Sequence, residues 1–316
     1  MDNALKVAKS VLHYNGGPTQ WAWAIHRVAG LGVLLFLALH IIDIFVAALG
    51  PGAFDHLLFL YRGPFARVLE ILLAFGLLYH GINGMRIIAA DFFPSLARLR
   101  TAQRLFFFEL VLFTILFIPV SYYLVWELPQ APFYHNPAIA AVVTLAILSL
   151  PVVLILGGRL RILSAVVSSD VSNGNSDEAF QRLLDIKQSR PQTQSLLETR
   201  IWFFMRVSGT LLIVLATIHV IVLDFMIGVQ NITYNVIVER WNSPVYPWLG
   251  FFWRLYDLAL LAFASTHGML GANYVVRDYV HGRRAQRIIQ WGMLAVWFTL
   301  ILMGMGIIFF FRGTLS

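Results

Sequence analysis

Four histidines lie deep inside apolar stretches of the sequence, where ionisable side chains are rare and require an explanation. They are His40, His80, His219 and His267. A neutral imidazole in such a place can form a hydrogen bond between helices, relay a proton or ligate a metal. The chain contains no cysteine, which excludes an iron–sulfur cluster held by its own thiolates and a thiolate zinc site. Any redox centre in this chain must therefore use histidine.

The histidines belong to two motifs that each occur twice with identical spacing. The first is Arg-x-x-Gly with a histidine thirteen residues after the arginine, and its copies are Arg27, Gly30, His40 and Arg206, Gly209, His219. The second is Arg-x-x-acid, then His-Gly-x-x-Gly, then Asp, and its copies are Arg67, Glu70, His80, Gly84, Asp91 and Arg254, Asp257, His267, Gly271, Asp278. Coincident spacing of so many polar residues within apolar segments indicates an internal duplication.

The duplication predicts that equivalent histidines face one another. At about 1.5 Å per residue, His40 and His219 lie about 15 Å from the outer helix ends, whereas His80 and His267 lie about 24 to 30 Å from them. Two imidazoles that face each other across a helix bundle can provide both axial ligands of a six-coordinate haem iron. We therefore predict two b-type haems, one above the other across the membrane.

Two glycines are expected to border the inner haem. Gly84 and Gly271 each lie one turn after the histidine of their motif, so a flat macrocycle can approach the backbone there. The alternative is that these glycines serve only close packing of helices.

A different di-haem layout places two histidines on one helix. His26 and His40 have the fourteen-residue spacing that this layout needs, but Met205 stands at the equivalent of His26 in the second half. The second half therefore does not fit that layout. We expect His26 beside a haem ligand or a propionate at the inner interface.

Five basic residues lie inside the apolar spans, namely Arg27, Arg67, Arg86, Arg206 and Arg254. Haem propionates near hydrocarbon must be paired or hydrogen-bonded. We expect Arg27, Arg86 and Arg206 to serve the inner haem and the other two to serve the outer haem. The alternative for those two is that their long side chains extend to the membrane surface.

Acidic residues in the repeat indicate proton and quinone chemistry. Asp91 and Asp278 lie eleven residues after their motif histidines, within about 20° of the same helix face, and are expected at the inner end of the haem cavity. Tyr279 follows Asp278, and an acid and a phenol together can exchange protons and hydrogen bonds with a quinone head group. Candidates for a second proton or quinone site nearer the outer side are Asp43, Glu70, Asp224 and Asp257.

Membrane-spanning helices must position these residues. The chain of 316 residues is 59% apolar and 12% charged, which excludes an ordinary soluble domain, and its apolar runs are too long for the strands of a barrel. The polar breaks predict seven spans, at 21–49, 65–90, 105–126, 138–157, 201–228, 248–276 and 288–311. The predicted fold is all-α, a polytopic transmembrane helical bundle in which two parallel three-helix repeats are joined by one extra helix.

The predicted organisation is a first three-helix unit at 1–126, a connecting helix and cytoplasmic linker at 127–200, and a second unit at 201–316. Outside the spans, Lys and Arg number 15 on the side of the N-terminus and 3 on the opposite side, which places the N-terminus in the cytoplasm and the C-terminus outside. This topology accounts for the net charge of +7, so the charge implies no nucleic-acid partner.

The motifs resemble those of the cytochrome b membrane anchor of succinate dehydrogenase and fumarate reductase, complex II. Residues 26–30 are similar to the first-helix signature of the larger anchor subunit, and residues 80–91 to its haem-ligand helix. His267, Gly271 and the Asp278-Tyr279 pair are similar to the corresponding helix of the small anchor subunit. The chain therefore resembles the two anchor subunits fused in one polypeptide.

The resemblance implies that the four histidines ligate two haems b in the pairs named above, and that Arg27, Asp278 and Tyr279 help to form an inner quinone site. Family members with a well-defined ubiquinone pocket carry a serine where Trp23 stands, which favours menaquinone over ubiquinone here. The implied partners are the flavoprotein and iron–sulfur subunits of complex II, in a bacterial or archaeal cytoplasmic membrane. The resemblance also admits a homotrimer of the complex.

The expected function is electron transfer between the iron–sulfur subunit and membrane quinone. The sequence carries no dinucleotide-binding fingerprint, so the dicarboxylate and flavin sites are expected on a partner subunit. One alternative is the di-haem cytochrome b of another quinone-linked oxidoreductase, such as a nitrate reductase or hydrogenase. A second is a proton-coupled transporter that uses the repeat and its buried acids.

Overall fold

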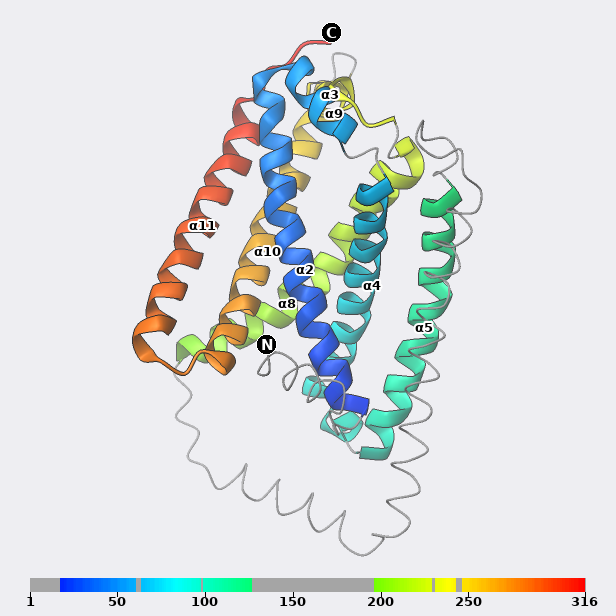
Figure 1. Cartoon of the computed structure of the whole chain (residues 1–316), viewed down its shortest axis with the longest axis vertical. Helices are drawn as coiled ribbons and strands as arrows, with labels where there is room; N and C mark the ends of the chain where they lie inside the picture. The colour runs from blue at the N-terminus through cyan, green and yellow to red at the C-terminus, as the bar shows by residue number, and fades with distance from the viewer. Residues whose placement is uncertain are drawn as a thin grey trace, which may run out of the picture.

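The computed structural model is built from long helices that run side by side (Figure 1), and it describes residues 18–60, 64–97, 99–126, 196–228, 231–242 and 246–315. The long helices of the first half are α2 (Pro18–Val46), α4 (Pro64–Phe92) and α5 (Leu99–Trp126). Those of the second half are α8 (Leu196–Val220), α10 (Pro247–Tyr279) and α11 (Arg283–Phe310). They correspond to six of the seven expected spans, and the span expected at 138–157 lies outside the described residues.

Five segments within the described ranges are long and apolar enough to cross a membrane. They are Thr19–Leu49, Phe65–Phe92, Thr101–Leu124, Leu196–Gly228 and Arg283–Phe310. The helix α10 is more polar, but at 33 residues it is long enough to cross, and it packs against α2, α8, α11 and the short helix α9 (Tyr234–Trp241). Its neighbours therefore shield polar side chains from lipid, as polar groups at membrane depth require. The chain is a multi-pass helical membrane protein.

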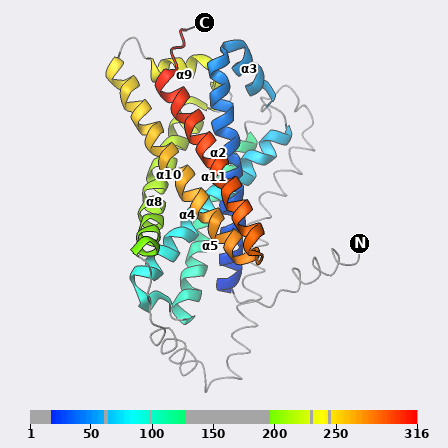
Figure 2. The same ribbon diagram turned by 90° about the vertical axis from the view of Figure 1, so that its left-hand side faces the viewer.

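The two halves have equivalent packing. In the first half α2 packs against α4, and in the second half α8 packs against α10, while α5 and α11 lie against α4 and α10 respectively. Across the halves, α2 packs against α10 and α4 packs against α8, so these four helices surround the centre of the bundle. Figure 1 shows α5 and α11 at opposite margins, and Figure 2 views the bundle from the α11 side.

Each half also carries a short helix between its first two long helices. In the first half, η1 (Ala47–Leu49) ends at Gly50, whose φ of 101° favours glycine, and Pro51 opens α3 (Pro51–Leu60). In the second half, the π-helical segment η4 (Ile221–Gly228) ends the first span and α9 (Tyr234–Trp241) follows. The Oδ1 atom of Asp55 on α3 accepts a hydrogen bond from the backbone N of Tyr234 at 2.8 Å. The two short helices therefore meet, and they cover one end of the bundle (Figure 1).

A buried polar network joins α4 to α2 and α5, on the side of the bundle where η2 (Pro94–Ala97) connects α4 to α5. Arg86 Nε donates to Glu109 Oε2 at 2.7 Å and to Asn83 Oδ1 at 3.0 Å. Asn83 is fully buried, and its Nδ2 donates to the carbonyl oxygen of Ala22 at 3.1 Å. Because Glu109 is only 2% exposed, its charge depends on Arg86 for compensation.

The second half carries a neutral pair at the equivalent place. Asn273 occupies the position equivalent to Arg86, six residues after the motif histidine, and its Oδ1 accepts a hydrogen bond from Gln290 Nε2 at 2.8 Å. We expect Glu109→Ala to lower the free energy of unfolding by about 3 kcal/mol, because it leaves a mostly buried guanidinium unpaired. The matched change Gln290→Ala should cost about 1 kcal/mol. Thermal denaturation of the full-length chain in detergent measures both losses of stability. Equal losses would contradict the view that the buried charge of Arg86 depends on Glu109.

Candidate functional site

The four motif histidines form two facing pairs inside the bundle. His80 on α4 and His267 on α10 have ring centroids 6.3 Å apart, with their planes at 89°. His40 on α2 and His219 on α8 have centroids 6.0 Å apart, with their planes at 87°. The structure therefore brings together the two pairs that the repeat predicted, each made of one histidine from each half.

The spacing of both pairs fits one metal ion held between two imidazoles. A metal–imidazole bond is about 2 Å long and the nitrogen lies about 1 Å from the ring centre, so imidazoles on opposite sides of one metal have centroids about 6 Å apart. The observed separations of 6.3 Å and 6.0 Å match this value.

Hydrogen bonds define the tautomers of the inner pair. The Nδ1 atom of His80 lies 3.1 Å from the carbonyl oxygen of His26, and because a carbonyl only accepts, Nδ1 must carry the proton. The Nδ1 atom of His267 lies 2.9 Å from the hydroxyl oxygen of Ser208, and that hydroxyl donates to the carbonyl oxygen of Met205 at 3.4 Å. A proton on Nδ1 leaves Nε2 with a lone pair, as metal ligation requires. His80 has this tautomer, and Ser208 is placed to accept the same proton from His267.

The glycines of the first motif provide room for the inner histidines. A Cβ atom on Gly30 would lie 2.7 Å from Cε1 of His80, and one on Gly209 would lie 3.4 Å from Cε1 of His267. The first helix of each half therefore packs its motif glycine against the motif histidine of the second helix. This contact explains why Arg-x-x-Gly and the later histidine repeat together.

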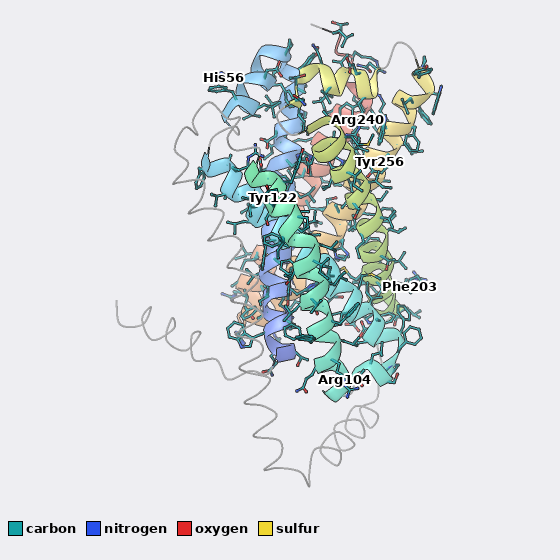
Figure 3. All side chains as sticks on the ribbon, turned by 90° about the vertical axis from the view of Figure 1, so that its right-hand side faces the viewer. His56, Arg104, Tyr122, Phe203, Arg240 and Tyr256 are labelled. Carbon is teal, nitrogen blue, oxygen red and sulfur yellow. The ribbon has the colours of Figure 1, made fainter. Side chains whose placement is uncertain are left out.

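The outer pair is bordered by charged and aromatic residues from α9 and α10. Asp257 Oδ1 lies 3.9 Å from Nδ1 of His219 and accepts a hydrogen bond from Arg240 Nη2 at 2.7 Å. Asp257 Oδ2 accepts a hydrogen bond from Trp241 Nε1 at 2.8 Å. Tyr256 donates a hydrogen bond to the carbonyl oxygen of Leu215, one turn before His219. Figure 3 labels Arg240 and Tyr256 at the end of the bundle opposite Arg104.

Two equivalent ion pairs cross between the halves at the other end. Arg27 of the first half pairs with Asp278 of the second at 2.5 Å, and Arg206 of the second half pairs with Asp91 of the first at 2.5 Å. A tryptophan four residues before each arginine covers its guanidinium, with Arg27 3.7 Å from the ring centre of Trp23 and Arg206 4.5 Å from that of Trp202. The expected residues of the inner quinone site therefore lie at this end, where Tyr279, the residue after Asp278, is 62% exposed.

Several buried donor atoms beside the histidine pairs lack a hydrogen-bond partner among the described residues. They are Nη1 of Arg27 and Nδ1 of His26 near the inner pair, and Nε of Arg240 and Nδ1 of His219 near the outer pair. Buried donors are normally satisfied, so the two arginine nitrogens suggest an acceptor that a bound group would supply. Each histidine pair thus has an arginine suited to a propionate carboxylate, which fits a haem.

The other predicted arginines have partners within the protein. Arg86 is held by Asn83 and Glu109 in the network described above, and Arg67 pairs with Glu70 at 2.5 Å. Arg254 donates to the carbonyl oxygens of Trp241, Ile308 and Phe311 and to Oδ1 of Asn242. Its guanidinium therefore joins the end of α11 to the end of α9, and the role that we expected for Arg254 at the outer haem stays a prediction.

The glycines of the second motif differ in their surroundings. A Cβ atom on Gly271 would meet nothing within 4 Å, which leaves room for a flat group beside the helix. A Cβ atom on Gly84 would lie 3.6 Å from Cε1 of His26. Gly84 therefore faces the histidine that stacks on His80, and the approach of a macrocycle to Gly84 stays a prediction.

Sequence reasoning missed Ser208, Arg240 and the contacts of two tryptophans with the motif arginines. Ser208 is fully buried and holds His267, but Ala29 stands at its equivalent in the first half, so the repeat gave no signal. Arg240 lies in a short helix that has no apolar periodicity of membrane length. The tryptophans that cover the crossing ion pairs could have been found, because Trp23 and Trp202 have the same spacing from the motif arginine.

Comparison with known proteins agrees with the duplication of the chain. A family model described as the succinate dehydrogenase/fumarate reductase transmembrane subunit matches residues 3–120 and again residues 185–306. The chain belongs to this family. A curated relative, the succinate dehydrogenase 2 membrane subunit SdhC of Mycobacterium tuberculosis (strain ATCC 25618 / H37Rv), is 32% identical over 82 residues. That match covers 26% of this chain and 60% of the relative, and the two family matches correspond to the two halves of the bundle.

The contact between Gly30 and His80 makes a sharp prediction about the inner pair. Gly30→Ala should displace the His80 imidazole, because the new Cβ would lie 2.7 Å from its Cε1, and should lower haem content by about one haem per chain. Gly32→Ala is the matched control, since nothing lies within 4 Å of its Cβ position, and it should retain full haem content. Pyridine haemochrome quantification per protein measures both variants, and full haem content in Gly30→Ala would rule out the proposed contact.

Proposed function

We propose that this chain is the di-haem cytochrome b membrane anchor of a succinate:quinone oxidoreductase and carries electrons between an iron–sulfur subunit and membrane quinone. The proposal rests on the two histidine pairs, in each of which one histidine from each half faces the other. Their ring centroids lie about 6 Å apart, which is the separation of two imidazoles that share one metal. Family membership favours complex II over the nitrate reductase, hydrogenase and transporter alternatives.

The chain's own residues would hold two haems b. His80 and His267 would ligate the inner iron, and His40 and His219 the outer iron. A bound haem supplies reversible one-electron exchange at its iron. His26 Nδ1 and Arg27 Nη1 would donate hydrogen bonds to propionate oxygens of the inner group, because these buried donors have no acceptor among the described residues.

The inner quinone site would include the ion pair between Arg27 of the first half and Asp278 of the second half. Arg27 and Asp278 meet at 2.5 Å under the ring of Trp23, and the adjacent Tyr279 is mostly exposed. A guanidinium and a phenol can donate hydrogen bonds to a quinone carbonyl, while the aspartate can exchange protons. Trp23 offers an aromatic face in place of a serine hydroxyl, which favours menaquinone over ubiquinone.

The proposed partners are the flavoprotein and iron–sulfur subunits of complex II, docked at the end of the bundle that carries the crossing ion pairs. The excess of Lys and Arg on that side favours a cytoplasmic position for it in a bacterial or archaeal cytoplasmic membrane, with the N-terminus inside and the C-terminus outside. The same family admits a homotrimer of the whole complex.

The haem assignment predicts a defined stoichiometry and a defined response to substitution. The purified complex should contain two haems b per chain by pyridine haemochrome quantification. His40→Ala should leave one haem with the spectrum of the inner site, and His267→Ala should leave the outer one, because the ligands come in separate pairs. One haem or none in the unsubstituted complex, or equal loss of both in His40→Ala, would refute the two-haem proposal.

The quinone assignment predicts loss of quinone turnover without loss of haem. Tyr279→Phe removes the phenol and should lower succinate:quinone reductase activity by at least about tenfold, at unchanged haem content. Tyr274→Phe, on the same helix, is the matched control and should keep activity. The measurement is the rate with a water-soluble menaquinone analogue, and an unchanged rate in Tyr279→Phe would place the quinone elsewhere.

A further inference from the structure

The two histidine pairs differ in the groups that face their Nδ1 atoms. In the inner pair the partners are neutral, a backbone carbonyl for His80 and the Ser208 hydroxyl for His267. In the outer pair the buried Nδ1 of His219 makes no hydrogen bond among the described residues, and Asp257 Oδ1 lies 3.9 Å from it. A carboxylate therefore stands behind one outer ligand, whereas both inner ligands have uncharged partners.

The carboxylate of Asp257 is held in one orientation. Arg240 Nη2 donates to Oδ1 at 2.7 Å and Trp241 Nε1 donates to Oδ2 at 2.8 Å. The side chain of Asp257 is 11% exposed and that of Arg240 is 12% exposed, so both charges lie largely inside the protein. Arg240 also lies over the ring of Trp253, 4.6 Å from its centre. The short helix α9 thus fixes both the position of the carboxylate and the charge next to it.

The comparison of the two halves singles out this aspartate. Glu70 occupies the equivalent position in the first half and pairs with the motif arginine, Arg67, at 2.5 Å. In the second half the motif arginine, Arg254, binds carbonyl oxygens at the end of α11 instead. Asp257 is therefore turned towards α9 and His219, and the duplicated acid has a different partner in each half.

We propose that Asp257 is a positioning residue for His219, and that its carboxylate, 3.9 Å from Nδ1 of the ligating imidazole, lowers the reduction potential of the outer haem. The inference rests on the proposed function. A carboxylate partner makes a ligating imidazole more electron-donating, and a nearby negative charge favours the oxidised, more positive iron. Arg240 opposes this effect, because it places a positive charge beside the same carboxylate.

Two substitutions that remove charges of opposite sign test the proposal. Asp257→Asn removes the negative charge with little change in shape and should favour reduction of the outer haem by about tenfold, which is 59 mV for a one-electron couple. Arg240→Gln removes the positive charge and should shift the same potential in the opposite direction. Glu70→Gln is the comparison variant in the first half, where the equivalent carboxylate pairs with Arg67, and it should shift the outer potential by less than Asp257→Asn does.

The measurement is a potentiometric titration of the haem absorption bands in the membrane-bound complex. Shifts of opposite sign in the outer haem, with a constant inner haem, support the proposal. A change that merely disturbed the fold would move both variants in the same direction, and an unmoved outer potential in either variant would overturn the proposal. Haemochrome quantification of the same samples distinguishes failure of the Asp257 proposal from failure of the proposed function. Two haems with an unmoved outer potential overturn only the former, whereas fewer than two haems in the unsubstituted complex overturn the proposed function as well.

Discussion

Polar hydrogens within a membrane-embedded bundle need acceptors, and this requirement governs the surroundings of the histidine pairs. An imidazole placed among apolar helices loses hydration and must recover a hydrogen bond from the protein. His80 recovers it from a backbone carbonyl, and His267 recovers it from a buried serine. Each of these bonds also leaves the opposite ring nitrogen with a lone pair, which is the form that the proposed metal ligation requires.

The internal repeat explains why the two halves place their histidines alike, and residues that differ between the halves explain why their surroundings differ. The two halves share the glycine that packs on the inner histidine and the tryptophan that covers the arginine. They differ where one half has Arg86 with Glu109 and the other has Asn273 with Gln290. Equivalent positions of the two halves therefore differ in charge, so the duplicated halves are not chemically alike.

The sequence alone was sufficient for the long helices and for the facing histidines, because apolar length and repeated spacing are local signals. It was insufficient for Arg254, whose acceptors are mostly backbone carbonyls that leave no trace in side-chain identity. It was also insufficient for Arg240, since only the folded chain shows that α9 turns back onto α10 beside His219. Charge pairing across distant segments depends on tertiary packing, which spacing along one helix cannot reveal.

The crossing ion pairs have a consequence for how such a chain matures. Arg27 and Asp91 belong to the first half, yet their counter-charges, Asp278 and Arg206, are synthesised later. During insertion the amino-terminal helices must hold two uncompensated charges near the membrane boundary until the carboxy-terminal helices arrive. Neither half is electrostatically complete alone, so a fused polypeptide delivers both complements in equal number and at the same place.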